Sequence, residues 1–162
     1  MTPESRTRES SPPNDAIRIA VTLGDPRGIG PEVTEKAVRG LRAAGPAPHL
    51  ILVGPSDSPL ADIGADYIDV GDYDGASARS AGRVAGLAIE KAVALARAGQ
   101  VDAIVTAPID KSAFHTAGYS YPGHTEMLAA LCGDVPVAMM MSAEETRLGT
   151  KDPLCGPGEA YG

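Results

Sequence analysis

The sequence predicts a three-layer α/β/α fold around a parallel or mixed β-sheet. Short apolar runs alternate with longer segments whose apolar residues recur at helical spacing, which is typical of successive βαβ units. The core must be built from Val, Ile, Leu and Ala, because the chain has one Phe, five Tyr and no Trp. Such cores are found in parallel sheets covered by helices, and 162 residues are enough for one domain of this kind.

The first strand and helix are expected between residues 17 and 44. Ile17 to Leu23 predicts a strand, and Gly24 to Pro31 predicts a tight loop. Pro31 suits the first helical position, and Glu32 suits the positive first turn. The helix is expected to end at Gly45. It is indicated by apolar residues at helical spacing: Val33, Ala37, Leu41 and Ala44.

The middle of the chain predicts two further strands and the clearest helix. His49 to Val53 reads as a strand, and Tyr67 to Val70 as a short one. Arg79 to Ala98 predicts a helix that is covered over most of its surface, with a narrow polar stripe. One of its faces is apolar: Val84, Ala88, Ala92 and Leu95. A buried strand from Ala103 to Val105 follows.

The last third predicts short helices and a final strand. Helices are expected at Ser112 to Ala117 and from Thr125 or Glu126 to Leu131. Val135 to Met141 reads as another buried strand, with its methionines as core filler. We expect residues 17–148 to form the α/β portion and residues 149–162 to form an irregular C-terminal tail.

Composition excludes several classes of function. A formal charge of −7 argues against a nucleic-acid or anionic-membrane partner. No apolar run reaches the roughly 20 residues of a membrane span. Residues 1–16 have no apolar core, so they predict a disordered tail and no secretory signal. Cys132 and Cys155 are expected to be free thiols, which favours a cytoplasmic protein.

Titratable residues gather where strands are expected to end. Asp110 and Lys111 directly follow the strand that begins at Ala103, and open α/β sheets bind ligands at the carboxyl ends of their strands. A carboxylate there could hold an amine or cation, and a lysine a phosphate or carboxylate. The alternative is a solvated helix cap beside a surface lysine.

His124, Thr125 and Glu126 open a predicted helix after Pro122 and Gly123. A histidine at this helix start could bind a polar substrate, or it could hydrogen-bond only its own loop. Thr125 or Gly123 could cap the helix, and Glu126 suits its positive end.

The remaining candidates are weaker. The Gly24 to Pro31 loop could hold an anion at a helix start, or it could be a tight turn without a ligand; it matches neither dinucleotide nor Walker fingerprints. His115 is expected at a helix surface, and His49 in a structural role. The three histidines are scattered along the sequence, so no local spacing predicts a metal site.

Four stretches together resemble the 4-hydroxythreonine-4-phosphate dehydrogenase family of pyridoxal phosphate synthesis, in residues, order and spacing. They are VTLGDPRGIGPE near the start, VTAPIDK in the middle, and then AGYSYPGHTE and VAMMMSAEETRL. The resemblance covers about residues 17–148.

The resemblance implies an NAD-dependent homodimer that requires a divalent metal such as Zn, Mg or Co. Such enzymes oxidise 4-phosphohydroxythreonine and release carbon dioxide, giving 3-amino-2-oxopropyl phosphate. Relatives act on phosphorylated four-carbon sugar acids or on a cyclic dihydrodiol dicarboxylate. The GHTE match implies that His124 and Thr125 contact the substrate. The strand-end match makes Asp110 and Lys111 residues of the same crevice.

The chain also departs from the family. Family enzymes are about twice as long, with a strand ending in a Thr-x-His metal ligand just beyond the position of Leu148 and two more ligand histidines later. Residues 149–162 contain no histidine, so the family's metal ligands and most of its cofactor surface are missing. Three hypotheses remain open: the truncated N-terminal half of a dehydrogenase fold, a non-catalytic relative that keeps a phosphoacid crevice, and an unrelated small phosphate-binding domain.

Overall fold

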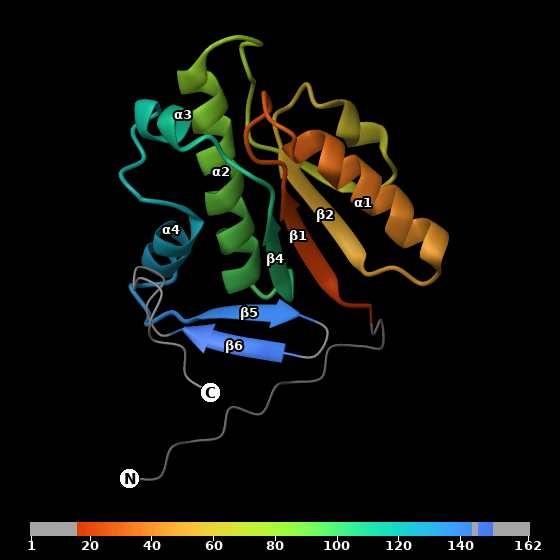
Figure 1. Cartoon of the computed structure of the whole chain (residues 1–162). Coiled ribbons are helices and arrows are strands. Elements are labelled where there is room, and N and C mark those ends of the chain that lie inside the picture. Colours follow the sequence, from red (N-terminus) through yellow and green to blue (C-terminus); the bar gives the residue numbers. More distant parts are fainter. Residues whose placement is uncertain (1–15, 144–145, 151–162) are drawn as a thin grey trace.

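The computed structural model describes residues 16–143 and 146–150, and its centre is a four-stranded parallel sheet in the order β3-β2-β1-β4 (Figure 1). The strands are β1 (Arg18–Thr22), β2 (His49–Gly54), β3 (Asp66–Asp69) and β4 (Ala103–Thr106). The predicted α/β fold is therefore confirmed. Arg18 and Asp102, 84 residues apart in the chain, join the beginnings of β1 and β4 through an ion pair of 3.1 Å.

Helices cover both faces of the sheet. α1 (Gly30–Ala44) lies on one face, where Val38 packs in a core with Leu23 and Leu52. α2 (Ala78–Arg97) lies on the other face (Figure 1), and a second core joins its alanines to strand residues. A short 3-10 helix, η1 (Pro59–Asp62), connects β2 to β3.

Two short helices pack on α2 at the side away from the sheet. They are α3 (Lys111–Thr116) and α4 (His124–Leu131). Ile89 of α2, Phe114 of α3 and Met127 of α4 form a third, fully buried cluster, and Phe114 stacks on Tyr119 with ring centroids 4.4 Å apart. This cluster fixes the two helices that carry the charged residues discussed below.

The expected buried strand from Val135 to Met141 is wrong. The strand is β5 (Met139–Ala143), and it pairs antiparallel with β6 (Thr146–Thr150) in a separate two-stranded sheet. Met139 and Met140 are 38% and 62% exposed, so these two methionines are not core filler. Ala143 pairs with Thr146, which is near it in the sequence, and such local pairing closes more easily than pairing with a distant strand.

β6 also reaches two residues into the segment expected to be irregular, because it includes Gly149 and Thr150. Residues 151–162 and 1–15 lie outside the described residues, so the expectations for both tails stay predictions. None of the helices in the described part of the chain combines the length and apolar character needed to span a bilayer.

α1 presents a different face to the core than its apolar spacing suggests. Its buried residues are Gly30, Thr34 and Val38, whereas the apolar stripe that contains Val33 and Leu41 is exposed. The sheet therefore leaves part of this side of the helix without a neighbour among the described residues.

Candidate functional site

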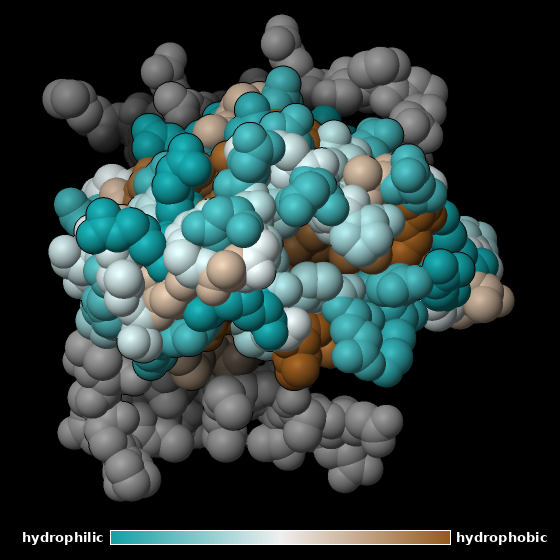
Figure 2. Space-filling view, turned by 90° about the horizontal axis from the view of Figure 1, so that it is seen from above, coloured by the Kyte–Doolittle hydropathy of each residue, from teal (hydrophilic) through white to brown (hydrophobic). Residues whose placement is uncertain are grey.

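The loops that follow β1 and β4 lie side by side at the carboxyl edge of the sheet. Thr22 pairs with Thr106 at the ends of the two strands, and the Asp25 amide donates to the Pro108 carbonyl at 3.1 Å. Figure 2 views this end of the molecule, where hydrophilic side chains surround hollows with hydrophobic residues at their base. The edge at which ligand crevices form in open α/β sheets is thus built from these two loops.

Glycine allows the two loops to touch. Gly24 has a φ of +69°, and a Cβ on it would lie 2.2 Å from the Pro108 carbonyl oxygen. A Cβ on Gly30 would lie 2.2 Å from the Leu23 carbonyl oxygen. Both close approaches are made to the chain itself, so the geometry favours the tight-turn interpretation of the Gly24 to Pro31 loop over an anion cradle.

Arg27 joins the two loops, and sequence reasoning missed it. Its guanidinium donates to both carboxylate oxygens of buried Asp25, at 3.1 and 2.7 Å, and to Asp110 at 3.1 Å. The Arg27 amide also donates to the Asp25 carboxylate, at 2.8 Å. Aspartates often accept from an amide two residues later in a turn, so the sequence spacing could have suggested that Asp25 and Arg27 pair. Arg27 therefore neutralises part of the negative charge that the two aspartates bring to this edge.

Asp110 caps α3, as the simpler of its two interpretations predicts. Its carboxylate accepts hydrogen bonds from the amides of Ser112 and Ala113, at 2.8 and 3.2 Å. These bonds to the amides, Ala113 first, lower the pKa of Asp110, and Arg27 adds to the effect. Most of the hydrogen-bonding capacity of this carboxylate is used within the protein.

The cap makes the start of α3 sensitive to acid. The pKa of Asp110 is lower in the folded chain than in an unfolded one, so its stabilising effect is complete above the ordinary aspartate pKa and disappears as pH falls through the lowered value. We expect the Ala113 amide resonance to titrate below the ordinary aspartate range of about 3.9. Asp110→Asn keeps a good N-cap without a titrating group, so its Ala113 resonance should show no such inflection. An inflection at the ordinary value, or one that persists in the variant, contradicts this.

His124 lies at the first turn of α4 with one ring nitrogen unsatisfied. Its Nε2 is buried and has no hydrogen-bond partner among the described residues. Burial lowers the pKa of His124, a hydrogen bond with the Ala107 backbone acts against that effect, and nearby Lys111 lowers the pKa further. The ring is therefore neutral at neutral pH. A neutral imidazole carries a hydrogen on one ring nitrogen and leaves the other as an acceptor.

Lys111 and Glu126 both lie at the start of α4, near His124. A Cβ placed on Gly123, the N-cap of α4, would lie 3.9 Å from the Lys111 Cε and 3.5 Å from the Glu126 Oε2, and no side chain caps this helix. The N–H groups of an uncapped first turn favour anions. Thr125 occupies the same turn and is half-buried. The structure thus brings together Lys111, His124 and Thr125, with Asp110 next to Lys111 in the chain.

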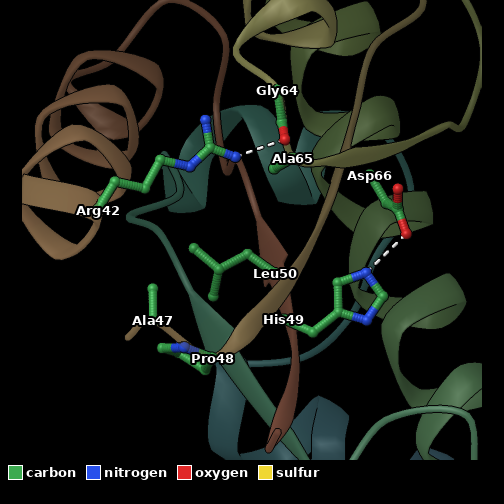
Figure 3. Close-up of a pocket in the computed structure, with 8 residues that line it drawn as sticks. All are labelled: Arg42, Ala47, Pro48, His49, Leu50, Gly64, Ala65 and Asp66. Atoms are coloured by element: carbon green, nitrogen blue, oxygen red, sulfur yellow. Dashed lines mark hydrogen bonds and ion pairs between the residues drawn. The ribbon is translucent and has the colours of Figure 1, made fainter. Parts of the chain in front are cut away.

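The other two histidines are engaged elsewhere. The His115 ring nitrogen Nδ1 lies 3.0 Å from the Tyr119 carbonyl oxygen. His49 pairs with Asp66 at 2.8 Å in a hollow of about 140 Å³ at the amino ends of β2 and β3 (Figure 3). In that hollow Arg42 donates to the carbonyls of Ile63, at 2.6 Å, and of Gly64. Because the hollow's charged groups have partners within the protein and lie at the opposite end of the sheet, we place the site at the carboxyl edge.

Within residues 16–143 and 146–150, no three His, Cys, Asp or Glu side chains gather in a set that could hold a metal ion. The carboxylates of Asp25 and Asp110 converge on Arg27 instead. The described residues therefore do not fit the divalent cation that the resemblance implies.

Comparisons with known proteins agree with the pattern of residues. Residues 56–150 match the family described as pyridoxal phosphate biosynthetic protein PdxA. The chain is 36% identical over 169 aligned positions to a 4-hydroxythreonine-4-phosphate dehydrogenase of Maricaulis maris, covering 80% of this chain and 48% of that protein. It is 37% identical to a D-threonate 4-phosphate dehydrogenase of Cupriavidus necator, covering 80% and 47% of the two chains.

Solved structures show the same relation. A 4-hydroxythreonine-4-phosphate dehydrogenase from Burkholderia phymatum superposes with a TM-score of 0.69 and 32% identity, over 84% of this chain and 49% of that one. The chain spans about half the length of the curated relatives that it matches. By sequence and by fold, this chain belongs to the PdxA family of pyridoxal phosphate biosynthetic proteins, whose matched members are named as dehydrogenases.

Proposed function

We propose that this chain provides the acid-binding wall of an NAD-dependent, metal-requiring dehydrogenase of phosphorylated four-carbon hydroxy acids. The substrate is 4-phosphohydroxythreonine, which is oxidised and decarboxylated to 3-amino-2-oxopropyl phosphate, or a related acid such as D-threonate 4-phosphate. The relatives' names support this substrate class. Family resemblance further supports a cytoplasmic homodimer.

The observation that carries the proposal is the unsatisfied Nε2 of His124 beside Lys111. A buried polar atom without a partner is costly, so it is normally satisfied by a ligand or an ordered water. A neutral imidazole can accept the hydrogen of a substrate hydroxyl. Lys111 and the first turn of α4 would then bind the acid or phosphate group of the same molecule.

Thr125 and Asp110 take different parts in this proposal. The Thr125 hydroxyl lies in the same first turn as His124 and would add a hydrogen bond to the bound anion. Asp110 is already held by Arg27 and by the α3 amides. We propose that it lines the crevice and positions Lys111 at the start of α3, while its direct contact with substrate stays a prediction.

NAD and the metal are proposed for the family's complete fold. NAD would accept the hydride, and a divalent cation would stabilise the charge that develops on the substrate oxygen. The described residues gather no metal ligands, and the Gly24 to Pro31 loop packs against its own chain.

A second candidate function is binding of the phosphorylated acid without its oxidation. It is supported by the Lys111–His124 site together with the lack of a metal-ligand set among the described residues. Heat of binding without NAD reduction would support this non-catalytic function. Chelator-sensitive NAD reduction by the chain alone would support a complete catalyst.

Calorimetry with D-threonate 4-phosphate tests the site. We expect His124→Ala to weaken binding by about tenfold to a hundredfold, because a hydrogen bond to a charged or buried group contributes about 1.5–3 kcal/mol. His115→Ala is the matched control, since His115 lies on the exposed surface of α3 and should leave the affinity unchanged. Equal heats for wild type and His124→Ala, or no heat with either, count against the proposal.

A further inference from the structure

Arg27 lies next to the candidate site, but its guanidinium is directed at two aspartates. Nε and Nη2 donate to the carboxylate of Asp25 at 3.1 and 2.7 Å, and Nη2 also donates to Asp110 at 3.1 Å. Asp110 immediately precedes Lys111 in the chain, so this contact places the Arg27 cation close to the Lys111 end of the site. Arg27 therefore links the loop after β1 to the residues that are proposed to bind an anion.

The charges around this site would repel an anion if Arg27 were left out. Asp25, Asp110 and Glu126 bring three carboxylates to this edge of the sheet. Lys111 brings one ammonium group to the same place. The proposed ligand itself carries a phosphate and a carboxylate, and like charges at short range repel each other. A second cation beside Lys111 is therefore needed to balance the carboxylates.

The burial of Asp25 fixes Arg27 in this position. The Asp25 side chain is 4% exposed, and a carboxylate buried to this extent needs a cation or several hydrogen bonds. Arg27 provides both, because its backbone amide donates to Asp25 at 2.8 Å in addition to its side chain. The Arg27 side chain is itself 31% exposed, so solvent screens its charge incompletely. Its charge is thus held at a fixed place beside the crevice.

We infer that Arg27 is a positioning residue of the anion site, which balances the carboxylates around Lys111 so that the Lys111 ammonium group attracts the phosphorylated acid. Arg27 acts through Asp25 and Asp110, and not by contact with the ligand. Without its charge, the Asp110 carboxylate would compete with the ligand for the neighbouring ammonium group and would repel the ligand. The inference rests on the proposed function, because it concerns an anion that Lys111 and His124 bind.

Three variants separate the charge of Arg27 from its shape, with calorimetry of D-threonate 4-phosphate as the measurement. Arg27→Gln removes the charge and should weaken binding by at least about tenfold. Arg27→Lys keeps the charge without the planar fork, so its affinity should stay within about threefold of the wild type. The double variant Asp25→Asn with Arg27→Gln removes one charge of each sign. The net charge of the crevice then equals that of the wild type, and the affinity should return to within about threefold.

Arg39→Gln is the matched control. Arg39 forms an ion pair of 2.8 Å with Glu35 in α1, and its side chain is 70% exposed. The control thus removes one paired arginine charge from the same chain away from the site, and the affinity should not change. Arg27→Gln leaves the buried Asp25 without its cation and is expected to destabilise the chain. If it does not fold, Arg27→Lys and the double variant decide the question, because both avoid an unpaired buried carboxylate.

The outcomes distinguish this inference from the proposed function on which it rests. If Arg27→Gln binds as the wild type does while His124→Ala still weakens binding, the inference is wrong and the proposed function stands. Binding by Arg27→Lys or by the double variant that is at least about tenfold weaker than wild type also overturns the inference, because the shape of Arg27 then matters and its charge does not. No heat with the wild type overturns the proposed function and the inference together.

Discussion

Replacing Gly82 with alanine is expected to lower the free energy of unfolding by about 3 kcal/mol, at the upper end of overpacking effects. A Cβ at this position of α2 would lie 2.1 Å from the Ala113 carbonyl oxygen and 2.4 Å from its carbon. These atoms belong to the backbone of α3, so no side-chain rotation can relieve the clash. α3 must move away from α2, and it takes the Lys111 end of the site with it.

Gly40→Ala is the matched control for this prediction. Gly40 is also inside a helix, α1, but a Cβ there meets nothing within 4 Å. The substitution should therefore stabilise the chain by about 1 kcal/mol, because alanine favours the helix over glycine. Urea denaturation followed by circular dichroism measures both variants. If the two substitutions change stability in the same direction, the close packing of α2 on α3 is wrong.

Phe114→Ala is expected to lower the free energy of unfolding by about 3–5 kcal/mol, as for other large-to-small changes in a core. Phe114 is buried among Ile89 and Met127 and stacks on Tyr119. Its removal leaves a cavity between α2, α3 and α4, where the neighbouring side chains are already packed. Because α3 and α4 carry Lys111 and His124, anion binding should weaken together with stability.

Leu41→Ala provides the comparison for the loss of Phe114. Leu41 is also a large apolar residue in a helix, but it is exposed, so its truncation should change stability by only about 0.5 kcal/mol. Urea denaturation of both variants measures the change in stability. Calorimetry with D-threonate 4-phosphate, at a temperature where both variants are folded, measures the change in anion binding. A loss for Phe114→Ala as small as that for Leu41→Ala would contradict the third core cluster.

The sequence predicts those parts of the fold that depend on local patterns. The helix expected from Arg79 to Ala98 is α2, Ala78–Arg97, and the strand expected from His49 to Val53 is β2, His49–Gly54. Helical periodicity and short apolar runs bounded by Gly and Pro are properties of neighbouring residues. Such patterns carry enough information to place an element within a residue or two.

Features that depend on distant partners are not predictable in this way. The Val135 to Met141 run has the composition of a buried strand, but whether it is buried depends on which strand it pairs with. The apolar stripe on α1 indicates a helix correctly, yet its spacing does not say that a neighbour is needed to cover it. In both cases the tertiary contact decides the outcome.

The candidate site likewise has some features that local patterns predict and others that depend on distant residues. The rule that crevices form at the carboxyl ends of strands predicts the shared location of Lys111 and His124. It does not predict that Arg27 holds Asp25 and Asp110 together, because this contact joins loops 83 residues apart. The cap that Asp110 forms follows from its position just before α3. That position alone does not distinguish a helix cap from a ligand-binding carboxylate.

The position of β1 in the sheet has a consequence for how the chain folds during translation. β1 pairs with β2 on one side, but its other side waits for β4, and the Arg18–Asp102 pair that joins them spans 84 residues. At about 5–20 residues per second, a ribosome needs roughly 4–17 s to make that stretch. During this interval one side of the nascent β1 lacks its strand partner, and an unpaired strand edge favours aggregation.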